Sequence, residues 1–140
     1  MILIKANKPV RRIYVVNLSK TEKREMCISL AQKLPEIRKL LHMSQKEFGA
    51  RCGISSNRLS AIENGHFVMT WSQLTSIILI CMVNKQTKEY FYANKLLNPR
   101  FFQYLQRKDE NIPPELNILV NPVIVMGYEE VITLDRDPII

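Results

Sequence analysis

The sequence predicts a mainly α-helical protein, a bundle of about five helices flanked by short β-prone segments. Apolar residues recur at helical spacing through much of the chain, which is typical of helices packed around a core. The capping-box pattern, in which Ser or Thr is followed three residues later by Glu or Gln, occurs at Ser19, Ser44 and Thr70. A length of 140 residues with 46% hydrophobic and 24% charged side chains is ordinary for one globular domain.

The pattern divides the chain into three parts. Residues 1–18 form a basic, β-prone arm, residues 19–110 are helical in pattern, and residues 111–140 form an acidic, β-prone tail. The expected strands are Ile13–Val16, Val123–Val125 and Val131–Leu134. An antiparallel pairing of arm and tail would cap the helices or be exchanged between two subunits, because exposed strand edges invite pairing.

The helical part is expected to begin after Ser19 and to run to Ala31. Pro35 then either kinks this helix or occupies the first turn of a new one. The apolar stripe continues through Ile37, Leu40 and Leu41.

Two short helices joined by a tight turn come next, and together they predict a helix-turn-helix. Ser44 caps the first helix, Gln45–Cys52, and Gly53 supplies the left-handed residue that ends it. Ser55 caps the second helix, which covers residues 56–64 and stops before a glycine. The expected inward-facing residues are Phe48, Ile54, Leu59 and Ile62.

The second of these helices carries polar side chains on its outward face. They are Ser56, Asn57, Arg58 and Ser60. Short hydrogen-bonding groups beside a cation are the residue types that read base edges and hold phosphates in DNA. An enzyme cleft would need converging acids or nucleophiles, so we expect no catalysis. The small residues Gly49 and Ala50 would let the two helices cross closely.

A further helix is expected after Thr70, with Gln73 completing its capping box. Its apolar face, as core or alternatively as a dimer surface, consists of Trp71, Leu74, Ile77, Ile78, Cys81 and Met82. Another helix would span Lys85–Asn94, and one more would follow Pro99. The aromatic residues expected to pack there, rather than to stack on bases, are Phe101, Phe102 and Tyr104.

Charge and composition narrow the class of protein. The net charge is +7, with eight basic and two acidic residues over 1–35 but one basic and five acidic residues over 111–140. This distribution points to a polyanion partner for the basic part, although a solvated lysine-rich surface accounts for it equally well. The longest apolar run, Ile77–Val83, is too short to cross a membrane, and the apolar start is too short for a secretory signal.

Neither cofactor nor metal is expected. The cysteines, Cys27, Cys52 and Cys81, are too widely spaced for a disulfide framework or a zinc site. We therefore expect a cytoplasmic protein. Cys52 beside an arginine is either a redox sensor or a buried structural thiol, and the latter is favoured. The acidic pairs Glu129–Glu130 and Asp135/Asp137 are either metal ligands or, as we expect, a solvated edge.

The spacing of residues 34–65 carries a family resemblance. The positions are Leu34, Ile37, Arg38, Ser44, Gln45, Phe48, Gly49, Gly53, Ile54, Ser55, Leu59, Ile62, Glu63, Asn64 and Gly65. With the Ser-Gln pair and the Ile-Glu-Asn-Gly run, this pattern resembles the phage-repressor-like Cro/Xre helix-turn-helix family. Met69–Ser72 is similar to a little-described bacterial branch. The resemblance implies a lambda-repressor-like five-helix unit over about residues 27–92.

The resemblance also implies a role for matching positions. The implied base readers are Ser56, Asn57, Ser60 and Ala61. The implied phosphate contacts are Ser44, Gln45, Arg58, Asn64 and His66, although Arg58 could instead reach a guanine. Gln45 would also brace the reading helix, and Arg38 with Glu63 would form an internal ion pair.

Three positions depart from the family pattern. His42 replaces a glycine, so a residue with a Cβ must take a left-handed turn. Gly49 replaces an alanine, which lowers helix propensity by about 1 kcal/mol. The loop at residues 66–69 lacks the family's Lys or Arg, so one phosphate anchor is missing.

From these patterns we interpret the protein as a sequence-specific, double-stranded-DNA-binding transcriptional regulator, a repressor. It would bind a near-palindromic operator as a homodimer joined through its flanks. The alternative interpretation is an antitoxin or adaptor whose C-terminal tail binds a partner protein.

Overall fold

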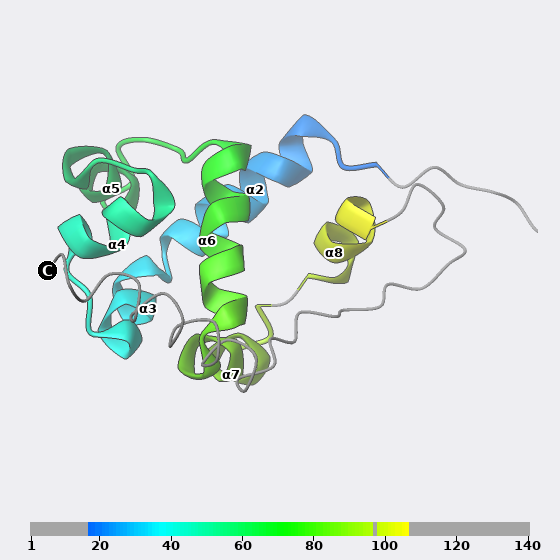
Figure 1. The fold of residues 1–140 in the computed structure, drawn as a ribbon. Coiled ribbons are helices and arrows are strands. Elements are labelled where there is room, and N and C mark those ends of the chain that lie inside the picture. The colour runs from blue at the N-terminus through cyan, green and yellow to red at the C-terminus, as the bar shows by residue number, and fades with distance from the viewer. Residues whose placement is uncertain (1–16, 97, 107–140) are drawn as a thin grey trace, which may run out of the picture.

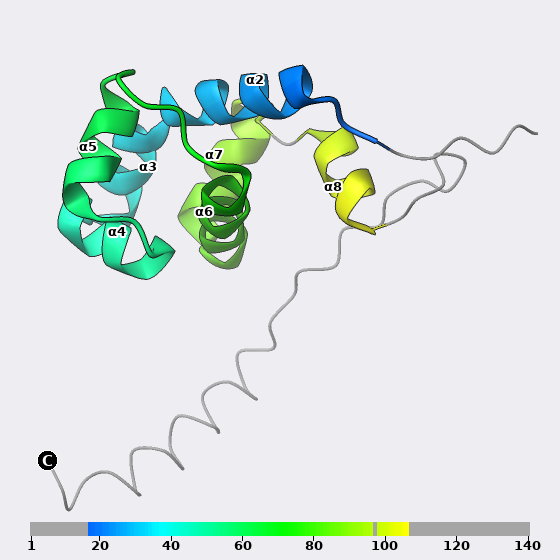
Figure 2. The same cartoon turned by 90° about the horizontal axis from the view of Figure 1, so that it is seen from above.

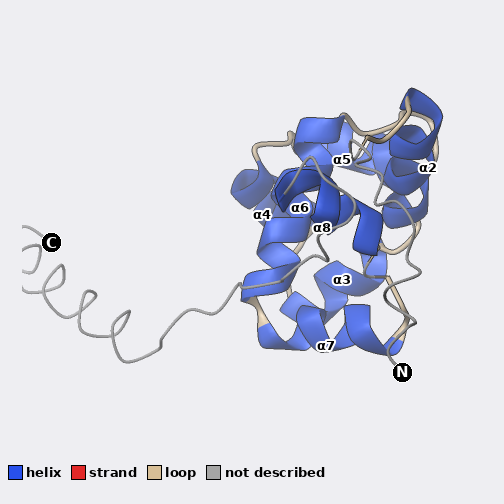
Figure 3. Cartoon of the chain, turned by 90° about the vertical axis from the view of Figure 1, so that its right-hand side faces the viewer, coloured by secondary structure: helices blue, strands red, loops and turns tan. Residues whose placement is uncertain are grey.

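A computed structural model of the chain describes residues 17–96 and 98–106, and these form helices with no strand among them (Figure 1, Figure 3). The helices are α2 (Lys20–Ala31), α3 (Leu34–Leu41), α4 (Gln45–Cys52), α5 (Ser56–Glu63), α6 (Trp71–Val83), α7 (Lys85–Ala93) and α8 (Pro99–Gln106). The mainly helical prediction is confirmed. The strands expected at 13–16, 123–125 and 131–134, and any pairing between them, lie outside the described residues, as do the acidic pairs at 129–130 and 135–137.

The helix-turn-helix occupies one end of the bundle. Helices α3, α4 and α5 lie together at that end, α6 runs through the middle, and α8 lies at the opposite end (Figure 1, Figure 2). Helix α6 packs against α2, α4 and α7. Because α6 is apolar on most sides and joins both ends, it carries the core on which α4 and α5 rest.

The helix starts follow the sequence closely. All three capping boxes form, because each cap hydroxyl accepts a hydrogen bond from the third helical N–H and the Glu or Gln side chain accepts one in return. Ser55 caps α5 through the backbone N–H of Arg58. Pro35 lies in the first turn of α3, so it starts a new helix rather than kinking α2.

Left-handed residues end the helices around the turn. Gly53 ends α4 with a φ of 75°, and Gly65 follows α5 with a φ of 80°. His42 ends α3 with a φ of 56°, which confirms that this non-glycine residue takes the left-handed conformation.

Apolar side chains of all the described helices, α2 to α8, form the core. Its fully enclosed members include Leu34, Ile37, Phe48, Leu59, Ile62, Leu74, Ile77, Cys81 and Phe91. The apolar stripe of α6 is therefore core, as expected, although Leu79 and Val83 on its other side are 57% and 51% exposed.

Aromatic packing attaches α8 to the rest of the bundle. Phe101 and Phe102 are buried, and Phe101 meets Trp71 edge-to-face with the ring centres 5.5 Å apart. Lys23 of α2 donates a hydrogen bond to the Tyr104 hydroxyl at 3.2 Å and lies over the Trp71 ring. These rings pack within the protein, as the sequence predicted, and are not available to stack on bases.

The crossing of α4 and the turn explains the glycine at position 49. Gly49 is buried, and a Cβ added there would collide with the backbone carbonyl oxygen of Ile54. The glycine therefore permits a close approach that alanine does not. The expectation for Ala50 was wrong, because Ala50 is exposed and lies away from the crossing.

We expect Gly49→Ala to lower the free energy of unfolding by about 1–3 kcal/mol, because the collision outweighs the gain in helix propensity. Urea denaturation measures the change. The neighbouring exposed substitution Ala50→Gly is the control, and it should cost about 1 kcal/mol from propensity alone. A Gly49→Ala protein more stable than the parent would contradict the tight crossing.

Candidate nucleic-acid interface

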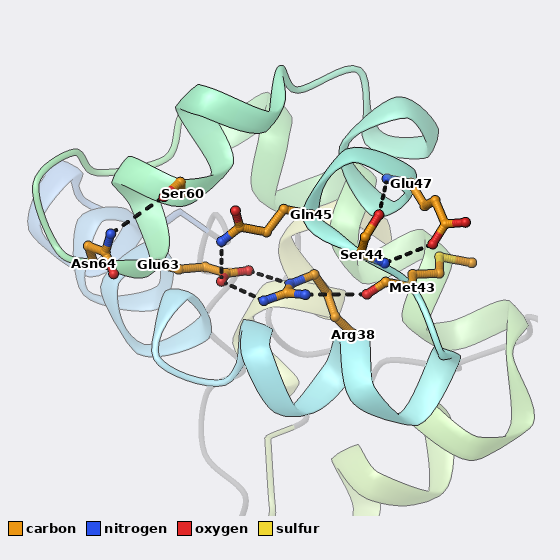
Figure 4. Close-up of polar contacts among 8 residues, drawn as sticks. All are labelled: Arg38, Met43, Ser44, Gln45, Glu47, Ser60, Glu63 and Asn64. Carbon is orange, nitrogen blue, oxygen red and sulfur yellow. Dashed lines mark hydrogen bonds and ion pairs between the residues drawn. The ribbon is translucent and has the colours of Figure 1, made fainter.

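An ion pair between α3 and the end of α5 lies at the base of the helix-turn-helix (Figure 4). Arg38 donates to the Glu63 carboxylate through Nε at 2.7 Å and Nη2 at 2.9 Å, the two-pronged geometry that suits a guanidinium. The side chains are 19% and 5% exposed, so the pair is largely removed from water. Hydrogen bonding to Glu63 raises the pKa of the Arg38 guanidinium, which therefore stays charged.

Glu63 also receives a hydrogen bond from the first residue of α4. Gln45 Nε2 donates to Glu63 Oε1 at 2.9 Å, and Arg38 Nη1 reaches the carbonyl of Met43 at 3.3 Å (Figure 4). The carboxylate thus joins three helices, α3, α4 and α5. We call Arg38, Gln45 and Glu63 the Glu63 clamp.

The sequence-predicted base readers all lie on α5. Ser56 and Asn57 are exposed, whereas Ser60 and Ala61 are partly buried. Asn57, Ser60, Ala61 and Asn64 are spaced by three, four and seven residues, which places them on one side of the helix. Asn64 Nδ2 lies 3.5 Å from Ser60 Oγ, a long hydrogen bond within this face (Figure 4).

The proposed phosphate contacts lie around this face. Ser44 uses its Oγ to accept the Glu47 N–H at 3.1 Å, so its cap is occupied while the hydroxyl hydrogen stays available. The reciprocal hydrogen bond, from the Ser44 backbone N–H to Glu47 Oε1 at 2.9 Å, is the main cause that lowers the pKa of Glu47. Gln45 is partly buried against Glu63, whereas Asn64 and His66 are exposed. The Glu63 clamp therefore holds the start of α4, which carries Gln45, close to the end of α5, which Asn64 follows.

One residue of this surface was missed from the sequence. Phe67, in the loop between α5 and α6, lies under the guanidinium of Arg58, whose Cζ is 3.7 Å from the ring centre. Phe67 is 40% exposed. The sequence offered one signal for this residue: an aromatic side chain occupies the loop of residues 66–69, where the family's Lys or Arg is missing.

The described residues provide no arrangement typical of metal chemistry. No three His, Cys, Asp or Glu side chains in this part of the chain lie close enough to hold a metal ion. Burial raises the pKa of Cys52 to about 11 and that of Cys81 to about 12. A thiol that resists ionisation favours the structural interpretation of Cys52 over a redox sensor. Across residues 17–96 and 98–106, no helix is both long and apolar enough to span a membrane.

Comparison with known proteins matches this part of the chain to a family. Residues 36–70, from the first turn of α3 to the cap of α6, match a family described as helix-turn-helix. No curated protein and no solved structure gave a significant match. The family match confirms the resemblance to the Cro/Xre type of DNA-binding helix-turn-helix.

We expect Arg38→Met to lower the free energy of unfolding by about 3–5 kcal/mol, because it leaves the Glu63 carboxylate buried without its cation. The double variant Arg38→Met, Glu63→Leu should lose less than the single variant, since it buries no unpaired charge. Urea denaturation at neutral pH gives both values. A single-variant loss below about 0.5 kcal/mol would mean that the pair behaves as an exposed surface pair.

The native thiols should react slowly. Burial raises the pKa of Cys27, Cys52 and Cys81, so we expect Ellman's reagent at about pH 8 to modify the folded protein at least roughly tenfold more slowly than the urea-unfolded chain. Rapid modification of Cys52 in the folded protein would restore the redox-sensor interpretation.

Proposed function

We propose that this chain, which carries a Cro/Xre-like DNA-binding helix-turn-helix, is a sequence-specific transcriptional repressor without catalytic activity. The observation that carries the proposal is the Glu63 clamp, which fixes α4 and α5 relative to α3 while the polar face of α5 stays open to solvent. A helix held in this way is preorganised to enter a major groove, so less conformational freedom is lost on binding.

Side-chain chemistry supports base reading by α5. Asn57 is exposed in the first turn, and an amide side chain can bond both N6 and N7 of adenine. Ser56 and Ser60 offer single hydrogen bonds, and the methyl group of Ala61 suits a thymine methyl. These four residues would specify sequence within one half-site.

Phosphate binding would come from the residues around α5. Ser44, Gln45, Asn64 and His66 offer hydrogen-bond donors, and Arg58 adds a cation. The net charge of +7 supports attraction to a polyanion. Gln45 is already bonded to Glu63 of α5, so a phosphate that binds Gln45 would be held at a fixed position relative to α5.

A homodimer would let two copies of α5 read a near-palindromic operator in successive major grooves. Two surfaces are candidates for joining the copies. One is the pair of β-prone flanks, and the other is the apolar patch of α6 formed by Leu79 and Val83, which lie one turn apart and are each about half exposed. Such a regulator would act in the cytoplasm.

The second candidate function is an antitoxin or adaptor. The acidic composition of residues 111–140 favours it, because such a tail suits a basic protein partner better than DNA. Co-purification of the full chain with one small protein, together with weak and sequence-independent DNA binding, would favour this candidate.

The test is a selection of binding sites from a random duplex library. We expect an enriched inverted repeat that is bound far more tightly than bulk DNA. Weak binding to every duplex that disappears as salt is raised would contradict sequence-specific recognition.

Two variants then distinguish residues that recognise bases from residues that bind phosphates. Asn57→Ala should reduce the discrimination between the selected operator and random DNA by about 1–3 kcal/mol, because a base contact is lost. Gln45→Ala should weaken all duplexes to a similar extent, and Gln86→Ala on α7 is the matched control, expected to change neither. An equal loss on every duplex for Asn57→Ala would overturn its reading role.

A further inference from the structure

The stack of Arg58 on Phe67 has no part in the helix-turn-helix core. Phe67 is 40% exposed, whereas the core aromatics Phe48 and Phe91 are almost fully enclosed. A ring that is partly exposed gains less from the hydrophobic effect than one that is fully enclosed. Its close neighbour is the guanidinium of Arg58, 3.7 Å from the ring centre, which is the geometry of a cation–π contact.

Arg58 itself lies in the first turn of α5 and is exposed. Its backbone N–H is bound by the hydroxyl of Ser55, so the start of its side chain is fixed. Over residues 17–96 and 98–106, the ion pairs are Arg38 with Glu63 and Arg100 with Glu22. The positive charge of Arg58 is therefore not neutralised by a carboxylate in the described part of the chain.

Stacking constrains the guanidinium without using its donors. All five N–H groups of arginine lie in the plane of the group, so a ring against one face leaves the donor edge free. The long side chain of arginine is otherwise flexible, and much of that freedom is lost when it binds a fixed target. A partner that orients the group beforehand lowers this loss.

The position of the ring decides which target the donors meet. Phe67 belongs to the loop that leaves α5, so the stack holds Arg58 against that loop and not over the face that carries Asn57 and Ser60. For a helix lying in a major groove, the groups at its flank meet the sugar–phosphate backbone, and the groups on its leading face meet base edges.

We propose that Phe67 is a positioning residue, which holds Arg58 so that its guanidinium binds a DNA phosphate beside α5. This inference rests on the proposed DNA-binding function. The pair supplies a cation at the loop of residues 66–69, where the sequence itself has neither Lys nor Arg. The cation comes from the helix, and the loop provides the surface that orients it.

The test compares operator affinity over a range of salt concentrations for matched variants. Arg58→Ala should weaken binding to every duplex and make the slope of log affinity against log salt shallower by about one. Phe67→Leu should weaken every duplex roughly two- to fivefold, whereas Phe67→Tyr, which keeps the ring face, should bind as the parent does. In an Arg58→Ala background, Phe67→Leu should have no further effect. Lys88→Ala on α7, which also removes one charge, is the control and should leave the slope unchanged.

Several outcomes would overturn the inference. A loss confined to one base position for Arg58→Ala would make Arg58 a base reader. A loss for Phe67→Leu that persists in the Arg58→Ala background would mean that Phe67 acts without Arg58. If the library selection enriches no sequence, the proposed function fails and this inference fails with it.

Nuclear magnetic resonance of the DNA-free protein distinguishes a failure of the proposed DNA-binding function from a failure of the Arg58–Phe67 stack. The side-chain protons of Arg58 should be shifted by the ring current of Phe67 in the parent and in Phe67→Tyr but not in Phe67→Leu. Unshifted Arg58 protons in the parent would refute the stack itself, whatever the DNA result.

Discussion

The helix-turn-helix depends on the hydrogen bonds that the carboxylate of Glu63 accepts. This carboxylate accepts two hydrogen bonds from Arg38 and one from Gln45, so α3, the start of α4 and the end of α5 meet at one side chain. At 5% exposure the carboxylate has few alternative partners in water, and its charge is tolerated because these donors surround it. The orientation of α5, and with it the direction of its polar face, follows from this junction.

Close packing between α4 and the turn restrains the helix-turn-helix in addition to the Glu63 clamp. The carbonyl of Ile54 approaches the backbone of α4 at Gly49, where no side chain intervenes, and Ile54 itself is buried between the helices. The hydrogen-bonded junction at Glu63 and the close backbone contact at Gly49 lie at different points of the helix-turn-helix, so together they restrain the angle between α4 and α5. The side chains that these contacts leave exposed on α5 are the ones available to bind a partner.

Much of this frame could be predicted from local sequence. Capping boxes, Pro35 and the left-handed residues at 42, 53 and 65 act within one turn of the chain, so their patterns predicted the helix boundaries. Contacts through space were less accessible. The exposure of Ala50 and the stack of Arg58 on Phe67 depend on how separate segments pack in space, and no spacing rule encodes them.

In the proposed complex, a preformed surface built on α5 and the start of α4 meets the DNA. Titration of the isotope-labelled protein with its selected operator, with every backbone amide followed by nuclear magnetic resonance, identifies the residues that meet the DNA. We expect the largest shifts at residues 44–46 and 55–67, with α7 little changed. Shifts concentrated on α7 or α8, with α5 unaffected, would contradict it.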